Sequence, residues 1–343
     1  MVNVSEVFHK KVEEIFAVQK LPEKLAVGVS GGVDSLALTI LLSEFCAKKK
    51  IELVALTVDH KMRESSSNEA LKLSKILAKK KITHHILEID AKKLPKKNIE
   101  AKLREMRYDL LCEFCKKKKI SYLFLGHQLG DVAENFLIRL FRGSGLDGLS
   151  TIAEVLEVSK IKLVRPLLDF DKSDLEKFLH AKKIKWFEDE TNSDEKFLRN
   201  KIRNFFATFE EKNLLHKRIK NATDEIAKMR DLFDSLMLVE AAEILEFKQD
   251  EYFLIDHKKL QKLDEKFALK ILALVTMEVS KKKYKPRLKD LKIFYEYLLK
   301  NSKIKPRNFY GCEIMQYGKK SLIVRSQKLR GKFELRTILK KIF

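Results

Sequence analysis

The sequence predicts an α/β fold in which helices cover both faces of a parallel sheet, followed by a mainly α-helical domain that ends in a short hairpin. Short apolar runs alternate with helical patterns through the first third of the chain. Strands buried on both faces are apolar at consecutive positions, and helices between them indicate parallel pairing. The 343 residues exceed one typical domain of roughly 100–200 residues. We therefore expect two domains, residues 1–210 and 211–343.

The first domain is predicted to open with an amphipathic helix over residues 4–19. Four strands are then expected, over residues 25–29, 51–58, 82–89 and 120–125. The helical patterns that separate and follow these strands cover residues 33–47, 66–80, 98–117 and 131–142. A Gly-rich loop over residues 143–148 precedes one more strand, residues 160–168. Ligands of such sheets bind beyond the carboxyl ends of the strands, so we expect the site at that edge.

The second domain is predicted to be mainly helical, with long helical patterns over residues 213–247, 266–279 and 288–301. Strands reappear over residues 313–316 and 321–325, and the Gly-containing segment between them indicates a hairpin. Lys and Arg are interleaved with Tyr and Pro in this half, in residues 281–287, 303–308 and 317–330. Such clusters are typical of surfaces that contact phosphates and stack on unpaired bases.

The composition favours an intracellular protein with an anionic partner. There are 71 Lys and Arg against 49 Asp and Glu, which gives a formal net charge of +22. This excess favours nucleic acid as a partner, although a Lys-rich proteome would also place lysines on every solvated face. Four scattered cysteines and the lack of an apolar leader predict a reducing cytoplasm. Charged residues interrupt every apolar run, so we expect no membrane helix.

The strongest motif is SGGVDS, residues 30–35, which lies directly after the first strand and opens a helix. Two glycines allow close backbone approach, and the helix N-terminus supplies unsatisfied N–H groups and partial positive charge. The motif therefore predicts a cradle for an anion. It lacks the Gly-Lys-Ser/Thr of a Walker loop and the spaced glycines of a dinucleotide fingerprint. The alternative is an ordinary Gly-rich turn between strand and helix.

Several further blocks accompany this motif in order along the chain. They are residues 58–63 (VDHKMR), 101–108 (AKLREMRY), 126–131 (GHQLGD), 139–148 (RLFRGSGLDG), 165–168 (RPLL) and 188–203 (EDETNSDEKFLRNKIR). Together with SGGVDS, which resembles the pyrophosphate loop of the ATP pyrophosphatase (PP-loop) superfamily, they resemble the tRNA(Ile)-lysidine synthase family. The resemblance covers roughly residues 21–205 and implies an adenine-nucleotide α-hydrolase-like fold.

The resemblance implies an ATP-dependent ligase that modifies the wobble cytidine of an isoleucine tRNA with a CAU anticodon. In this family ATP first adenylates the carbonyl oxygen of the base and releases pyrophosphate. The ε-amine of free lysine then attacks the same ring carbon and expels AMP, which yields lysidine. The expected partners are this tRNA and free L-lysine, with neither membrane nor DNA.

The resemblance carries the ATP site onto residues Ser30, Gly31, Gly32, Val33, Asp34 and Ser35. The hydroxyls and backbone N–H groups suit the phosphates of ATP. Asp34 suits Mg²⁺, a hard cation that takes oxygen ligands and often bridges phosphates and carboxylates.

A lysine substrate needs local acid in so basic a chain. Asp131 and Glu134 lie three residues apart at the start of a helix, hence on one face, and are expected to bind the amino groups of lysine. The alternative for both is simple capping of the helix N-terminus. Arg107 and His127 are expected to oppose negative charge on the adenylate or on the lysine carboxylate. With Asp34 these four residues form the expected catalytic set.

Basic residues outside this set are expected to contact phosphate or tRNA. They are His60, Arg63, Arg199, Arg203, Lys283, Arg287 and Lys319. His60 and Arg63 suit either the nucleotide or the tRNA, and ion pairs on a surface helix are the alternative for Arg203.

Two rival functions depend on other features. A tRNA-thiolating enzyme of the same superfamily would need sulfur-handling cysteines, and Cys112 and Cys115 are the one close pair. These two lie within a helical pattern with no second pair nearby, so we expect small, buried helix residues rather than a four-ligand metal site. A non-catalytic RNA-binding protein on the same fold would tolerate the loss of Asp34, Asp131 and Arg107, yet all three are present.

Overall fold

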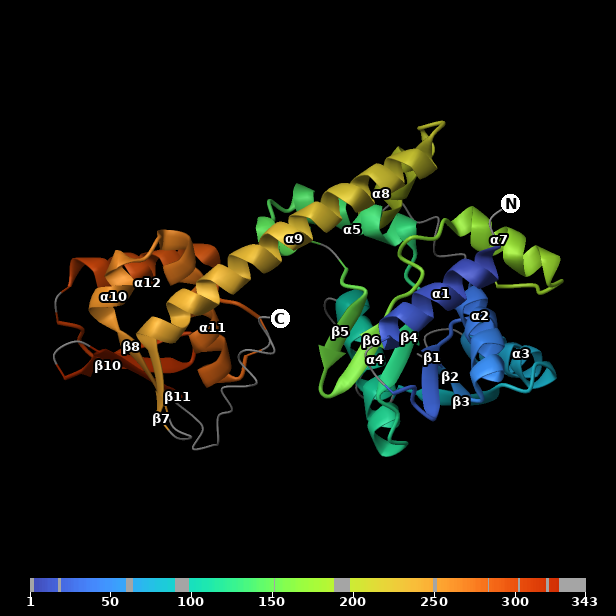
Figure 1. The fold of residues 1–343 in the computed structure, drawn as a ribbon, viewed down its shortest axis with the longest axis horizontal. Coiled ribbons are helices and arrows are strands. Elements are labelled where there is room, and N and C mark those ends of the chain that lie inside the picture. The colour runs from blue at the N-terminus through green and yellow to red at the C-terminus, as the bar shows by residue number, and fades with distance from the viewer. Residues whose placement is uncertain are drawn as a thin grey trace. The chain divides into compact units, whose positions relative to one another are not determined.

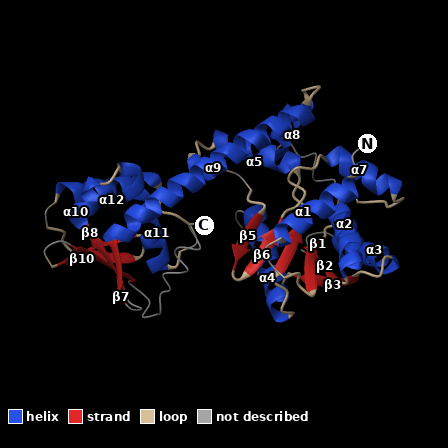
Figure 2. Ribbon diagram, viewed as in Figure 1, coloured by secondary structure: helices blue, strands red, loops and turns tan. Residues whose placement is uncertain are grey.

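The computed structural model describes residues 3–17, 20–59, 64–89, 99–150, 152–187, 198–248, 252–282, 284–301, 303–318 and 321–326. It divides into two compact units, Met1–Ala227 and Lys228–Phe343. Each unit contains its own sheet, as Figure 2 shows by colour.

The first unit is built on a six-stranded, mostly parallel sheet, which confirms the predicted fold class (Figure 1). Its strands are β1 (Lys24–Gly28), β2 (Glu52–Asp59), β3 (Thr83–Glu88), β4 (Tyr122–Leu125), β5 (Val155–Val158) and β6 (Ile161–Val164). They are arranged in the order β3-β2-β1-β4-β6-β5. Only β5 runs antiparallel to its neighbour, at an edge of the sheet. It was not predicted because all four of its residues are exposed and no burial pattern marks them.

Helices cover both faces of this sheet. They are α1 (Val4–Phe16), α2 (Val33–Lys49), α3 (Glu64–Lys79), α4 (Ile99–Lys117), α5 (Leu129–Phe141), α6 (Leu146–Leu149), α7 (Lys172–Ala181) and α8 (Leu198–Ala207). Successive residues of a strand point to opposite faces. Leu25 and Val27 of β1 therefore join one core with α1, α2, α3 and α7, whereas Ala26 joins a second core with α4 (Figure 1).

The strand order fixes where a ligand can bind. β2 and β3 lie on one side of β1, and β4 and β6 lie on the other. The chain therefore leaves β1 toward one side of the sheet and leaves β4 toward the other. These two strands pair in parallel, with Gly28 opposite Leu125. In open α/β sheets the crevice outside the carboxyl ends of such a strand pair is the usual ligand site.

The second unit combines helices with a sheet that is larger than the predicted hairpin. The long helix α9 (Lys212–Ile244) runs from the first unit into it, and α10 (His257–Lys262), α11 (Glu265–Ser280) and α12 (Leu288–Lys300) follow. The strands β7 (Leu245–Lys248), β8 (Tyr252–Asp256), β9 (Arg307–Phe309), β10 (Cys312–Tyr317) and β11 (Ser321–Ser326) form an antiparallel sheet in the order β7-β8-β11-β10-β9. The expected hairpin is its β10–β11 pair. β7 was included in the predicted helix over residues 213–247, because its short apolar run continues the helical pattern.

Candidate functional site

The loop between β1 and α2, residues 29–32, has the closed geometry that the SGGVDS motif predicts. Ser30 donates its backbone N–H to Ser35 Oγ at 3.1 Å, and Ser35 Oγ donates to the carbonyl oxygen of Gly32 at 3.1 Å. Gly31 has a φ of +87°, and a Cβ there would lie 2.4 Å from the ring of Phe187. Phe187 also donates its N–H to the Gly31 carbonyl oxygen at 3.0 Å. Only glycine fits this position.

The N-terminus of α2 is open to an anion. Its N-cap is Gly32, and among the described residues no side chain caps it. By contrast α1, α5 and α7 of the same unit are capped by Asn3, Gln128 and Asp171. The first N–H groups of a helix have no intrahelical partner and carry partial positive charge, so this end of α2 suits phosphate oxygens.

The loop after β4 approaches the first turn of α2 backbone to backbone. A Cβ on Gly126 would lie 2.9 Å from Ser35 Cα and 3.0 Å from the Ser35 backbone nitrogen. Real Cβ atoms essentially never come so close to backbone. The absence of a side chain at Gly126 therefore lets the segment that leads into α5 lie against the first turn of α2.

Asp34 is a half-buried residue at this junction. Burial of its carboxyl, followed by repulsion from Asp131, raises its pKa to about 7, and the charges of Lys172 and Arg203 oppose the shift. Its Oδ1 atom is buried and has no hydrogen-bond partner among the described residues. An unsatisfied carboxylate oxygen beside an open helix N-terminus is what a hard divalent cation bound to phosphates would use. The residues present therefore fit Mg²⁺.

Asp131 and Glu134 lie on the first turns of α5, and both have protein partners. Asp131 Oδ2 accepts the backbone N–H of Gln128 at 3.0 Å, as a helix cap does. Glu134 Oε1 accepts from Arg203 Nε at 2.6 Å, and its Oε2 is paired with Arg199 Nε at 3.1 Å. Burial, with repulsion from Asp131, raises the pKa of Glu134 despite the two arginines. Asp131 thus makes the capping contact that was the alternative reading of this pair, and Glu134 forms ion pairs that join α5 to α8.

A second group of side chains at the site combines the neutral ring of His127 with arginines. His127 Nε2 lies 3.2 Å from Arg104 Nη2, and its Nδ1 is buried without a partner in the described part of the chain. Burial lowers the pKa of His127 well below its usual value, and the charges of Arg165, Arg104 and Arg107 lower it further. The guanidinium groups of Arg104 and Arg107 lie 5.6 and 5.8 Å from the ring centroid of Tyr108.

The arginines of this group have no carboxylate partner among the described residues. Burial lowers the pKa of both Arg107 and Arg165, and Arg165 Nη1 donates to the carbonyl oxygen of Ala153 at 2.7 Å. Buried cations without anions are costly unless a ligand supplies the charge. Neither Arg104 nor Arg165 was predicted from the sequence as a site residue. Arg104 lies one helical turn before Arg107, and that spacing was the clue that could have identified it.

The remaining predicted contacts are distributed over the chain. Arg199 and Arg203 lie on α8, where they meet Glu134. Arg287 is the exposed N-cap residue of α12 in the second unit. Four residues lie outside the described part of the chain: His60, Arg63, Lys283 and Lys319.

The cysteines belong to the hydrophobic core. Cys112 and Cys115 are both buried on the face of α4 that packs against the sheet. Burial raises the pKa of both thiols, that of Cys115 to about 12. In the described ranges no group of three or more His, Cys, Asp or Glu residues is placed to hold a metal ion. The buried environment of Cys112 and Cys115 is that of structural residues, as the sequence predicts.

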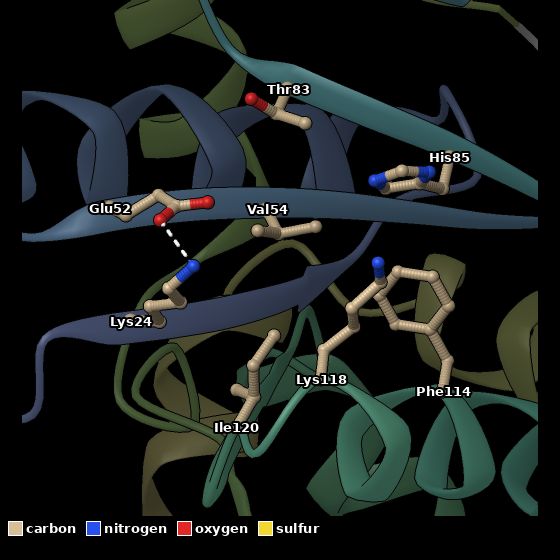
Figure 3. Close-up of a pocket in the computed structure, with 8 residues that line it drawn as sticks. All are labelled: Lys24, Glu52, Val54, Thr83, His85, Phe114, Lys118 and Ile120. Atoms are coloured by element: carbon tan, nitrogen blue, oxygen red, sulfur yellow. Dashed lines mark ion pairs between the residues drawn. The ribbon is translucent and has the colours of Figure 1, made fainter.

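A separate small pocket lies at the opposite edge of the sheet, where β1, β2 and β3 begin (Figure 3). Lys24 Nζ and Glu52 Oε2 form an ion pair there at 2.8 Å. The cavity measures about 100 Å³, which is too small for a nucleotide. Its lining residues are Lys24, Glu52, Val54, Thr83, His85, Phe114, Lys118 and Ile120.

None of the described helices is long and apolar enough to cross a membrane.

Comparisons with known proteins show which proteins this chain resembles. A family model described as the PP-loop domain matches residues 4–208. The tRNA(Ile)-lysidine synthase of Wolbachia pipientis wMel is 36% identical, over 88% of this chain and 70% of that protein. That of Rickettsia typhi is 31% identical, over 88% of this chain and 69% of that protein.

The fold also resembles a solved structure, that of the U34-tRNA thiolase NcsA from Methanococcus maripaludis with its 4Fe-4S cluster. The TM-score is 0.53 and the sequence identity 19%, over 64% of this chain and 78% of that chain. This likeness extends to the fold alone.

The raised pKa of Asp34 predicts a pH-dependent cost of folding. Between its ordinary value of 3.8 and about 7, the folded protein keeps a proton that the unfolded chain has released. The free energy of unfolding should therefore fall as the pH rises through this window. Asp34→Asn mimics the protonated acid and should raise the free energy of unfolding at pH 8, by ~1.4 kcal/mol for each pKa unit that is relieved. The gain should shrink as the pH falls to 5.

Denaturant unfolding without Mg²⁺ and ATP, at pH 5 to 8, measures this difference. Asp174→Asn is the matched control, because the Asp174 carboxylate is about half exposed on α7, and it should leave the pH dependence unchanged. If Asp34→Asn raises the free energy of unfolding equally at pH 5 and pH 8, the raised pKa of Asp34 is contradicted.

Proposed function

The chain belongs to the tRNA(Ile)-lysidine synthases, which are ATP-dependent PP-loop ligases, and we propose that it joins free lysine to the wobble cytidine of an isoleucine tRNA with a CAU anticodon. The family predicted from the sequence is confirmed. The observation that best supports the proposed chemistry is the junction at Gly126, where an open helix N-terminus meets two buried polar atoms without a partner among the described residues, Asp34 Oδ1 and His127 Nδ1.

In the first step the loop after β1 binds the phosphates of ATP. The backbone N–H groups of Gly32, Val33 and Asp34, with the hydroxyls of Ser30 and Ser35, surround the pyrophosphate portion, and Gly31 allows the close approach. Asp34 holds Mg²⁺, which neutralises phosphate charge when bound. The carbonyl oxygen of the cytosine attacks the α-phosphorus, and the bond to pyrophosphate breaks.

The cationic group binds the negative charge of the adenylated base. Arg104 can only donate hydrogen bonds, so His127 Nε2 is the acceptor of their contact and the proton of the neutral ring lies on Nδ1. Nδ1–H is then a free donor for a phosphate oxygen. Arg107 and Arg165 supply the balancing charge.

In the second step Asp131 and Glu134 bind the amino groups of lysine. The ε-amine must lose a proton to become a nucleophile, because its reference pKa is about 10.4. The raised pKa of Glu134 makes its carboxylate a better proton acceptor than an ordinary glutamate. The amine attacks the ring carbon, and AMP leaves with the oxygen.

The tRNA is proposed to contact both parts of the chain. Residues 1–210 form the catalytic domain, with His60, Arg63, Arg199 and Arg203 near the anticodon or the nucleotide. Residues 211–343 bind the tRNA backbone through basic residues that include Lys283, Arg287 and Lys319. The exposed position of Arg287 supports this role.

The proposed reaction is tested by incubating the full chain with labelled lysine, ATP, Mg²⁺ and unmodified CAU-anticodon isoleucine tRNA. Lysine should enter the tRNA only when ATP is present, with one AMP released per lysine. Asp34→Ala should abolish incorporation, whereas Asp174→Ala, on the exposed part of α7, should retain it. Incorporation without ATP, or none with all components, would refute the proposal.

The tRNA contact of Arg287 is tested by the salt dependence of binding. Removing one phosphate contact should weaken binding and reduce the slope of log affinity against log salt by about 1. Arg287→Ala should show this change while ATP binding is kept. Lys177→Ala, an exposed residue of α7 in the first unit, serves as the control. An unaltered slope in Arg287→Ala would mean that this arginine is only solvated.

A further inference from the structure

A partly buried chain of hydrogen-bonded polar side chains runs from α3 through β3 and β2 to Val29, directly after β1. Ser74 Oγ lies 2.7 Å from His84 Nδ1, and His84 Nε2 lies 2.8 Å from Thr57 Oγ1. Thr57 Oγ1 donates to the carbonyl oxygen of Val29 at 2.8 Å. Val29 is the residue directly before the SGGVDS motif.

The hydrogen bonds of this chain have a single consistent direction. The one hydroxyl proton of Thr57 is donated to Val29, so Thr57 Oγ1 must accept from His84 Nε2–H. The neutral ring then has an unprotonated Nδ1, which accepts from the Ser74 hydroxyl. Burial and the neighbouring His85 lower the pKa of His84 to about 4, which keeps the ring neutral.

The hydrogen-bond chain ends on the Val29–Ser30 peptide, which begins the loop after β1. The carbonyl of the Val29–Ser30 peptide accepts from Thr57, and the N–H of the same peptide donates to Ser35 Oγ at 3.1 Å. Val29 in addition donates its own N–H to the Leu56 carbonyl oxygen at 2.9 Å. Side chains therefore fix both ends of this peptide plane, and with it the direction in which the loop leaves the sheet.

We propose that His84 and Thr57 are positioning residues of the ATP site, which act by orienting the Val29–Ser30 peptide through this chain. They touch no substrate. The inference rests on the proposed binding of ATP phosphates by the loop after β1. Loss of this hydrogen-bond chain lets the Val29–Ser30 peptide rotate. The loop after β1 must then become ordered when ATP binds, so ATP affinity falls while the chemistry at the cytosine is kept.

The test measures KM for ATP, KM for lysine and kcat in variants of the full chain. Thr57→Val removes the hydroxyl with little change of shape, and His84→Leu removes the donor. Both should raise KM for ATP by about three- to tenfold, the range expected from one lost hydrogen bond, with kcat and the KM for lysine within about twofold. Thr57→Ser keeps the hydroxyl and His84→Gln keeps a donor at the Nε2 position, so both should restore KM for ATP.

Two further variants separate positioning from stability and from the ATP assignment itself. Thr276 is a buried threonine of α11 whose Oγ1 donates to the Leu272 carbonyl oxygen at 2.7 Å. Thr276→Val should lower the melting temperature without raising KM for ATP. If Thr57→Val and His84→Leu raise that KM no more than Thr276→Val does, the inference is overturned. Ser35→Ala tests the loop directly, and an unchanged KM for ATP in that variant would overturn the ATP placement together with the inference.

Discussion

The site depends on the contact between the backbone of Gly126 and the first turn of α2. A Cβ on Gly126 would lie 2.9 Å from Ser35 Cα, which leaves no room for a side chain, so the loop after β4 meets the first turn of α2 through the main chain. Strand order places the loops after β1 and β4 side by side, and the missing side chain closes the remaining distance. A helix N-terminus that suits phosphate oxygens thereby comes next to the helix that carries Asp131 and Glu134. One edge of the sheet can then serve both halves of the proposed two-step ligation.

Charge is separated within this site. The Glu134 carboxyl and the Oδ1 atom of Asp34 are buried and the pKa values of both groups are raised, whereas half-buried Arg107 and buried Arg165 have no acidic partner among the described residues. ATP and the adenylated base are anions, and lysine carries cationic amines. A site with only one sign of charge could not bind both. The net charge of +22 is a total over the whole chain and gives no sign of this division.

Much of this could be predicted from the sequence because local rules determine it. Apolar runs separated by helical patterns identified the parallel strands, and SGGVDS identified the loop because its glycines and helix N-terminus act over a few residues. The pairing of Glu134 with Arg199 and Arg203 depends on the packing of α5 against α8, which no local pattern encodes. Exposed β5 and the sheet around the β10–β11 hairpin were missed for the same reason, since short strands are stabilised by their neighbours.

The most direct measurement is the affinity of ATP·Mg²⁺ for Gly126→Ala, determined by calorimetry alongside thermal unfolding of the same samples. Gly145→Ala is the matched control, because a Cβ at Gly145 would meet nothing within 4 Å. If the contact of Gly126 with the first turn of α2 builds the site, a folded Gly126→Ala variant should bind ATP at least tenfold more weakly. Gly145→Ala should bind ATP like the wild type. Wild-type affinity in Gly126→Ala would contradict the account.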